Sequence, residues 1–225
     1  MEDNPSVQKS GPRSIIGPLN VYGIVALAGI MGPIVLSLAD IIAAFFAPEY
    51  DLIRNSISSL VFTSVGWLQT IGFLVIGLLV EVFTVGLFFS IRRGRGFGIS
   101  ISVFVCIGFG LLLIGAFQTD PIGTPHTLEG WIHSITATTV FSLFPIACLL
   151  ILPSLRSDPY WKGLFLYTTV ISVLASVLMI GSIWRPAQLS WFGLYERIIV
   201  WNIVIWVEVM AIRLLRLSLT AGWKT

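Results

Sequence analysis

The chain has 225 residues, of which 56% are hydrophobic and only 11% are charged. Soluble globular domains carry about 25% charged residues, so a soluble fold of this length has too few polar side chains to cover its surface. The small net charge of +2, with basic residues scattered along the chain, argues against a nucleic-acid-binding protein. Because a lipid bilayer accepts apolar side chains on the outside of a fold, we expect one integral membrane domain.

The chain begins with a polar stretch over residues 1–18 that is rich in Pro, Gly and Ser. We predict a disordered tail there, since no apolar segment follows Met1 closely. Six apolar stretches come next, and each reaches the roughly 20 residues that a helix needs to cross the hydrocarbon core. Their expected bounds are near 20–46, 65–90, 97–117, 128–152, 162–184 and 194–215. Since lipid cannot satisfy unpaired backbone groups, the predicted fold is an all-α, six-helix transmembrane bundle over residues 19–217, with a short tail at 218–225.

The connections between these stretches are short, and their Lys and Arg content predicts the orientation of the chain. The fourth connection contains Pro153, so we expect the fourth helix to end before it. With the N-terminus inside, three basic residues fall on the outer side and ten on the inner side. The ten are Lys9, Arg13, Arg92, Arg93, Arg95, Arg156, Lys162, Arg213, Arg216 and Lys224. We therefore predict a multi-pass protein of the cell membrane with both termini in the cytoplasm.

The predicted outer side gathers both histidines and five of the eleven acids. If Thr124 caps the fourth helix and Pro125 is its first residue, then His126, Glu129 and His133 stand at i, i+3 and i+7 on one face. Such a face can bind zinc or a similar cation and leave one position for water. A metal-bound water would permit hydrolysis at the outer interface.

The same residues allow two other interpretations. In the first, Asp120 and His133 form a hydrogen-bonded cap that ties the third helix to the fourth. In the second, the cluster handles protons or binds a substrate. The sequence leaves all three interpretations open, because the spacing is no standard zinc signature.

Glu196 and Arg197 begin the sixth helix. A glutamate in the first turn is favourable to the helix dipole. Arg197 shares a stripe with Trp201, Val204 and Glu208, so we expect it to face the bundle. It can pair there with an acid, for which the alternatives are Asp51, Asp120 and Glu129, or it can bind a lipid phosphate or a carboxylate.

Three acids lie within the predicted helices, namely Asp40, Glu81 and Glu208. A charge at bilayer depth costs at least about 2.5 kcal/mol, so each of them is a candidate functional residue. Asp40 lies near enough to the outer end to join the cluster there, and Glu208 lies near the inner end. Glu81 is the deepest, and it serves either a proton or ion relay or helix packing through one hydrogen bond.

Three patches resemble a family of bacterial and archaeal membrane proteins known as domain of unknown function 998. The patches are Arg54-Asn55-Ser56-Ile57-Ser58-Ser59-Leu60, Gly115-Ala116-Phe117-Gln118-Thr119-Asp120-Pro121 followed by Gly130-Trp131-Ile132-His133, and Gly193-Leu194-Tyr195-Glu196-Arg197. The resemblance implies a six-helix integral membrane fold and no established activity. It also implies a constellation of outer-side residues, namely Ser56, Ser59, Asp120, His133 and Arg197.

Three functions remain open on these observations. The leading hypothesis is a non-enzymatic membrane protein whose outer polar cavity binds a lipid headgroup or small polar ligand, or anchors a partner. The candidate ligand-binding residues are Arg54, Ser56, Ser59, Asp120, His126, Glu129, His133, Glu196 and Arg197. The alternatives are a hydrolase of a lipid-like substrate, with or without a metal at His126, Glu129 and His133, and a small transporter that uses Glu81.

Overall fold

The computed structural model describes residues 20–121, 123–183, 190–220 and 223. These residues contain six α-helices, which confirms the all-α prediction. The helices are α1 (Val21–Phe45), α2 (Trp67–Ser90), α3 (Phe97–Ala116), α4 (Leu128–Ser157), α5 (Phe165–Ile183) and α6 (Phe192–Ser218). All six are long and apolar enough to cross a membrane. The tail predicted over residues 1–18 lies outside the described residues.

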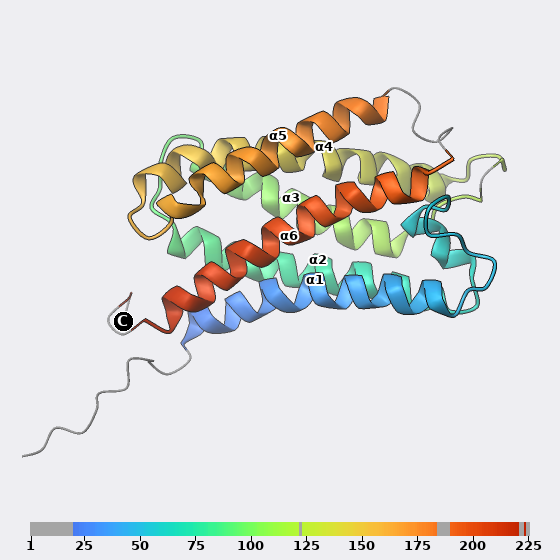
Figure 1. Cartoon of the computed structure of the whole chain (residues 1–225), viewed down its shortest axis with the longest axis horizontal. Helices are drawn as coiled ribbons and strands as arrows, with labels where there is room; N and C mark the ends of the chain where they lie inside the picture. Colours follow the sequence, from blue (N-terminus) through green and yellow to red (C-terminus); the bar gives the residue numbers. More distant parts are fainter. Residues whose placement is uncertain (1–19, 122, 184–189, 221–222, 224–225) are drawn as a thin grey trace, which may run out of the picture.

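Each helix packs against its neighbours in chain order, and α6 returns to α1. Figure 1 shows α4 and α5 along one edge, α1 and α2 along the other, and α6 crossing obliquely between them. The start of α1 and the end of α6 lie at the same end, where the Asn20 amide donates to the Ser218 carbonyl at 3.3 Å. The first and last helices therefore begin and end on one side of the membrane, and which side that is stays a prediction.

Aromatic packing holds the middle of the bundle together. The Trp206 ring of α6 stacks on Phe104 of α3 at 5.0 Å and meets Phe144 of α4 edge-on at 5.7 Å. Its indole N–H donates to the Thr168 hydroxyl of α5 at 3.1 Å. A buried indole needs such a partner, so one side chain links four helices.

The predicted end of the fourth helix was wrong, because α4 continues through Pro153 to Ser157. Proline removes one backbone donor from a helix but does not have to end it. The end comes instead at Asp158, whose carboxylate accepts from the Tyr160 N–H at 2.8 Å and from the Arg92 N–H at 2.7 Å. A side chain that satisfies two backbone donors fixes the turn that proline was expected to make.

Residues 46–66, 117–121 and 123–127 lie at the opposite end of the bundle from Asn20, together with the first turns of α4 and α6. We call this the histidine end, because both histidines lie there. A short 3₁₀ helix, η1 (Ile57–Phe62), runs within its first connection. A second, η2 (Lys162–Leu164), precedes α5 at the other end.

Candidate functional site

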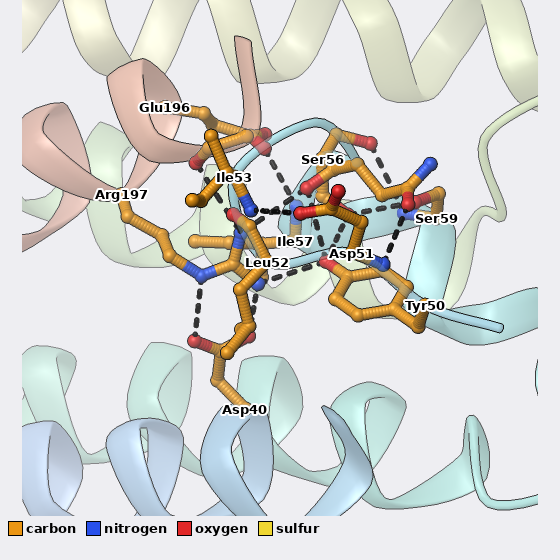
Figure 2. Close-up of polar contacts among 12 residues, drawn as sticks. Asp40, Tyr50, Asp51, Leu52, Ile53, Ser56, Ile57, Ser59, Glu196 and Arg197 are labelled. Atoms are coloured by element: carbon orange, nitrogen blue, oxygen red, sulfur yellow. Dashed lines mark hydrogen bonds and ion pairs between the residues drawn. The ribbon is translucent and has the colours of Figure 1, made fainter. Parts of the chain in front are cut away.

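Arg197 lies at the centre of a buried polar network at the histidine end (Figure 2). Its side chain is only 3% exposed, which confirms that it faces the bundle. Its Nε and Nη2 donate to the two carboxylate oxygens of Asp40, at 3.1 and 2.8 Å. This bidentate geometry is the strongest form of an arginine–carboxylate pair. The partner is therefore Asp40, from the end of α1, rather than any of the three acids that the sequence suggested.

The rest of the guanidinium binds the first connection and the first turn of α6. Nη1 donates to the carbonyls of Leu52, Asn55 and Gly193, at 2.8, 3.1 and 3.2 Å. Nη2 also donates to the Tyr50 hydroxyl at 2.8 Å. A guanidinium has five N–H donors, and these contacts occupy all of them. Arg197 thus has no donor left for a lipid phosphate, and that alternative is not supported.

Glycine at position 193 allows this close approach. A Cβ there would collide with the Asn55 carbonyl oxygen and would lie 2.8 Å from that of Leu52. The backbone of the first connection therefore rests directly on the first turn of α6, within reach of Arg197.

Tyr50 fixes the same segment from the other side. Its hydroxyl donates to the Ser56 carbonyl at 2.6 Å while it accepts from Arg197. Burial raises the pKa of Tyr50 to about 12, and the neighbouring Arg197 opposes that rise. The phenol therefore keeps the proton that it donates throughout the physiological range.

The predicted serines of this connection stabilise its turn. Ser56 Oγ accepts from the Ser59 N–H at 3.2 Å, and Ser59 Oγ donates to the Ser56 carbonyl at 2.7 Å. Arg54 lies outside the network, since its side chain is 74% exposed and pairs with Asp51 at 3.4 Å. Ser56 and Ser59 therefore shape the loop, and Arg54 lies on the surface.

Glu196 contacts the start of η1. Its carboxylate accepts from the Ile57 N–H at 2.6 Å. The predicted position of Glu196 in the first turn was wrong, because α6 begins at Phe192 and its first turn contains no acidic residue. Glu196 and Arg197, adjacent on α6, therefore hold two successive parts of the first connection.

Asp120 caps the start of α4 in a second polar cluster. Thr127, not Thr124, is the N-cap, so His126 precedes the helix and shares no helical face with His133. Asp120 accepts from the Thr127 hydroxyl at 2.7 Å, from its N–H at 3.0 Å, and contacts His126 Nδ1 at 3.3 Å. The Thr127 hydroxyl is the main cause that lowers the pKa of Asp120. The prediction that Thr124 and Pro125 begin the helix was wrong because this carboxylate satisfies the donors at Thr127.

His133 is buried in the second turn of α4, with 5% exposure. Its Nδ1 lies 2.8 Å from the Phe117 carbonyl oxygen, and its Nε2 lies 3.0 Å from Ser58 Oγ. Asp120 and His133 thus each tie the end of α3 to α4, as the cap interpretation expected, although through different partners.

The structure does not assemble His126, Glu129 and His133 into a ligand set. His126 and Glu129 are exposed, and His133 is buried against Phe117 and Ser58. Within the described part of the chain, no group of three or more His, Cys, Asp or Glu side chains is arranged to hold a metal ion.

A cavity of about 430 Å³ lies beside His133, between α4, α5, α6 and η1. Nine polar side chains line it: Ser56, Ser58, Thr119, His133, Ser134, Thr138, Ser182, Tyr195 and Glu196. The apolar remainder comprises Ala137, Phe141, Met179, Phe192 and Ile199. Of the residues predicted from the sequence, Ser56, His133 and Glu196 meet here.

Residues 30–213 match the sequence model of a family described as "Protein of unknown function (DUF998)". The chain belongs to this family. The matched segment contains every residue of the cavity and of the Arg197 network, so both belong to the DUF998 domain. Neither the curated proteins nor the solved structures include a match to this chain.

The three intramembrane acids of this DUF998 protein lie in different surroundings. Asp40 belongs to the Arg197 network. Glu81 is half-buried against α3, where Gly108 leaves room for its carboxyl group, since a Cβ there would lie 2.6 Å from Glu81 Oε1. Glu208 is half-buried, and its Oε2 makes no hydrogen bond to the described residues. Neither Glu81 nor Glu208 lines the cavity.

Proposed function

We propose that this DUF998 protein resides in the cell membrane and uses the cavity between α4, α5 and α6 to bind a lipid headgroup or a small polar ligand. The observation that supports this is the composition of the wall. Nine of its fourteen lining side chains carry a hydroxyl, an imidazole or a carboxylate. Hydroxyl groups both donate and accept hydrogen bonds, so the wall suits a ligand with several polar groups.

The depth of the cavity strengthens the proposal. Thr138 lies ten residues beyond the start of α4, which corresponds to about 15 Å along the helix axis. Polar groups within the hydrocarbon core are costly unless they find partners. The Thr138 and Ser182 hydroxyls each donate to a backbone carbonyl of their own helix, which leaves their oxygen lone pairs free to accept from a bound polar group.

The charge of the wall selects among ligands. It carries one acid, Glu196, and neither lysine nor arginine. The neighbouring Arg197 is saturated by Asp40, Tyr50 and backbone carbonyls. We therefore expect a neutral or cationic polar group, and we expect a phosphate to be excluded.

The test compares three lipids that share an oleoyl-length chain. Mono-oleoylglycerol is neutral, oleylamine is cationic, and oleoyl lysophosphatidate is anionic. We expect the first or the second to raise the unfolding temperature of the protein in detergent, because a ligand that binds only the folded state stabilises it. Lysophosphatidate should produce no such shift. Equal shifts with all three lipids would contradict the argument from charge.

Two threonines of α4 provide a matched pair of variants. Thr138 and Thr139 are adjacent and both exposed, but only Thr138 lines the cavity. Thr138→Leu should abolish the stabilisation by lipid, whereas Thr139→Leu should preserve it. If both variants respond to the lipid as the wild type does, the ligand binds elsewhere.

A further inference from the structure

Ser58 and His133 form a hydrogen-bonded pair whose proton positions follow from the structure. A carbonyl oxygen can only accept, so the Phe117 carbonyl at 2.8 Å places the proton of the neutral imidazole on Nδ1. Nε2 then carries the lone pair, and it lies 3.0 Å from Ser58 Oγ. The serine hydroxyl therefore donates to Nε2. A serine that donates to a histidine held by a third group is the arrangement that activates a nucleophile.

The pair is accessible as well as ordered. Both residues line the cavity of about 430 Å³ proposed above as the ligand site. They also line a smaller chamber of about 10 Å³ beside α2 and α3. That volume corresponds to about one water oxygen, so the chamber has room for a single oxygen atom next to Ser58.

Gln69 of α2 lines this small chamber, and its amide has no partner. Its side chain is 1% exposed, and neither Nε2 nor Oε1 makes a hydrogen bond to the described residues. Leaving a buried amide unpaired costs about 1–3 kcal/mol. Such an amide is available to donate to an oxygen that enters the chamber, which is how oxyanion-stabilising side chains act.

The segment that carries Ser58 is held rigidly. Glu196 binds the Ile57 N–H, Tyr50 binds the Ser56 carbonyl, and Arg197 binds the carbonyls of Leu52 and Asn55. The buried ion pair between Asp40 of α1 and Arg197 of α6 thus lies in a network that also positions a short loop. Catalytic groups need this kind of support, because small displacements reduce rates strongly.

We propose that the cavity hydrolyses an ester of a neutral lipid, with Ser58 as the nucleophile, His133 as the base and Gln69 as the oxyanion donor. This inference rests on the proposed function, since the substrate occupies the same cavity. Ser58 Oγ attacks the ester carbonyl carbon while its proton moves to His133 Nε2, and Gln69 Nε2 donates to the carbonyl oxygen. The bond to the alcohol then breaks, and the leaving oxygen takes the proton from Nε2.

Water completes the cycle. It attacks the acyl group on Ser58 and gives its proton to His133 Nε2. The bond to Ser58 Oγ breaks, the serine recovers its proton from Nε2, and a carboxylic acid leaves. The sum is ester plus water giving acid plus alcohol, without a metal or a redox partner.

A dodecyl fluorophosphonate tests the assignment, because an activated serine displaces fluoride from phosphorus and keeps the phosphonyl group. We expect the full-length protein in detergent to gain one adduct, which peptide mass spectrometry locates on Ser58. His133→Gln should lower the labelling rate at least about 100-fold, and Gln69→Met should lower it by a similar factor. Ser64→Ala, at an exposed serine in the same connection, should label at the wild-type rate.

Gln69→Met guards against a loss of folding as the explanation. Since the amide makes no hydrogen bond within the described part of the chain, its removal should leave the unfolding temperature equal to or above that of the wild type. A wild-type protein that acquires no label, or an adduct on a residue other than Ser58, overturns the catalytic assignment. An unchanged labelling rate in Gln69→Met overturns the role of Gln69.

Binding of mono-oleoylglycerol separates this proposal from the proposed function. A wild-type protein that is stabilised by mono-oleoylglycerol but not labelled by the fluorophosphonate has the binding site without the catalytic pair. A protein that is not labelled, and that neither mono-oleoylglycerol nor oleylamine stabilises, overturns both.

Discussion

Two polar clusters at the histidine end carry out related structural tasks under different conditions. The Arg197 network joins α1 and α6 to the first connection and is buried, whereas the Asp120 cap joins α3 to α4 and includes the exposed His126. In the first, every donor of one guanidinium is used by backbone and side-chain acceptors. In the second, one carboxylate satisfies the start of a helix beside solvent. Although the hydrogen bonds of the two clusters have similar lengths, we expect their loss to lower the free energy of unfolding by very different amounts.

The difference also bears on the candidate site. The Arg197 network fixes the segment with Ser58, so damage there should affect both the fold and the cavity. The Asp120 cap fixes only the start of α4, whose second turn His133 also ties to Phe117. Variants of the Arg197 network should therefore lose more stability than variants of the Asp120 cap. They should also lose lipid binding, which the variants of the cap should keep.

The largest effect is expected from Arg197→Met. Removal of the guanidinium leaves the Asp40 carboxylate buried without its partner, which costs about 3–5 kcal/mol. The free energy of unfolding, measured by denaturant titration in mixed micelles, should fall by that amount, and mono-oleoylglycerol should no longer stabilise the protein.

The double variant Asp40→Leu with Arg197→Met is the control for this prediction. It removes both charges, so it should recover much of the stability lost in the single variant. It should not recover lipid binding, because the first connection still lacks its donors. A single variant as stable as the wild type would show that the pair contributes little.

A smaller effect is expected from Tyr50→Phe. The variant removes an acceptor of Arg197 and the donor to the Ser56 carbonyl, and a buried group left unpaired costs about 1–3 kcal/mol. Denaturant titration at pH 7 gives the difference directly.

The same variant has a pH signature. The folded protein holds the Tyr50 proton up to a pKa of about 12, above the ordinary value of 10.0. The contribution of the protonated phenol to the free energy of unfolding is therefore complete below pH 10, and it disappears as the pH rises to about 12. The difference in stability between the wild type and Tyr50→Phe should shrink over that interval. A difference that stays constant from pH 9 to pH 12 would contradict the buried-phenol interpretation.

The sequence was sufficient to predict the fold, because the length and apolarity of each span are local properties. The six predicted helices differ from the observed ones by three residues or fewer at most ends. The exception, beyond Pro153, arose where Asp158 and Arg92 meet from different connections. Contacts of that kind depend on tertiary structure, which no window of sequence reports.

The site was predictable only in part, for the same physical reason. Burial of Arg197 followed from helical periodicity, but its partner Asp40 lies 157 residues away. Ser58 was passed over in favour of Ser56 and Ser59, although all three lie in one matched patch. Only the contact between Ser58 and His133 of α4 in the folded protein distinguishes this serine from those that close their own turn. Gln69 had no sequence signal, since a glutamine near a helix end is ordinarily solvated.

The smallest losses of stability are expected at the Asp120 cap. There Asp120→Asn should destabilise the protein more than His126→Ala. The carboxylate binds two groups of Thr127, while His126 adds one exposed contact of 3.3 Å, and exposed pairs contribute little. Because its folded pKa is lowered, Asp120 stabilises the protein above its ordinary pKa and loses that contribution as the pH falls through the folded value. The unfolding temperature of Asp120→Asn should therefore lie below that of the wild type at pH 7, and the two should converge in acid.

Stabilisation by mono-oleoylglycerol should survive in both variants, since neither residue lines the cavity. Its loss in Asp120→Asn would mean that the start of α4 positions the cavity after all, and that the two clusters act as one.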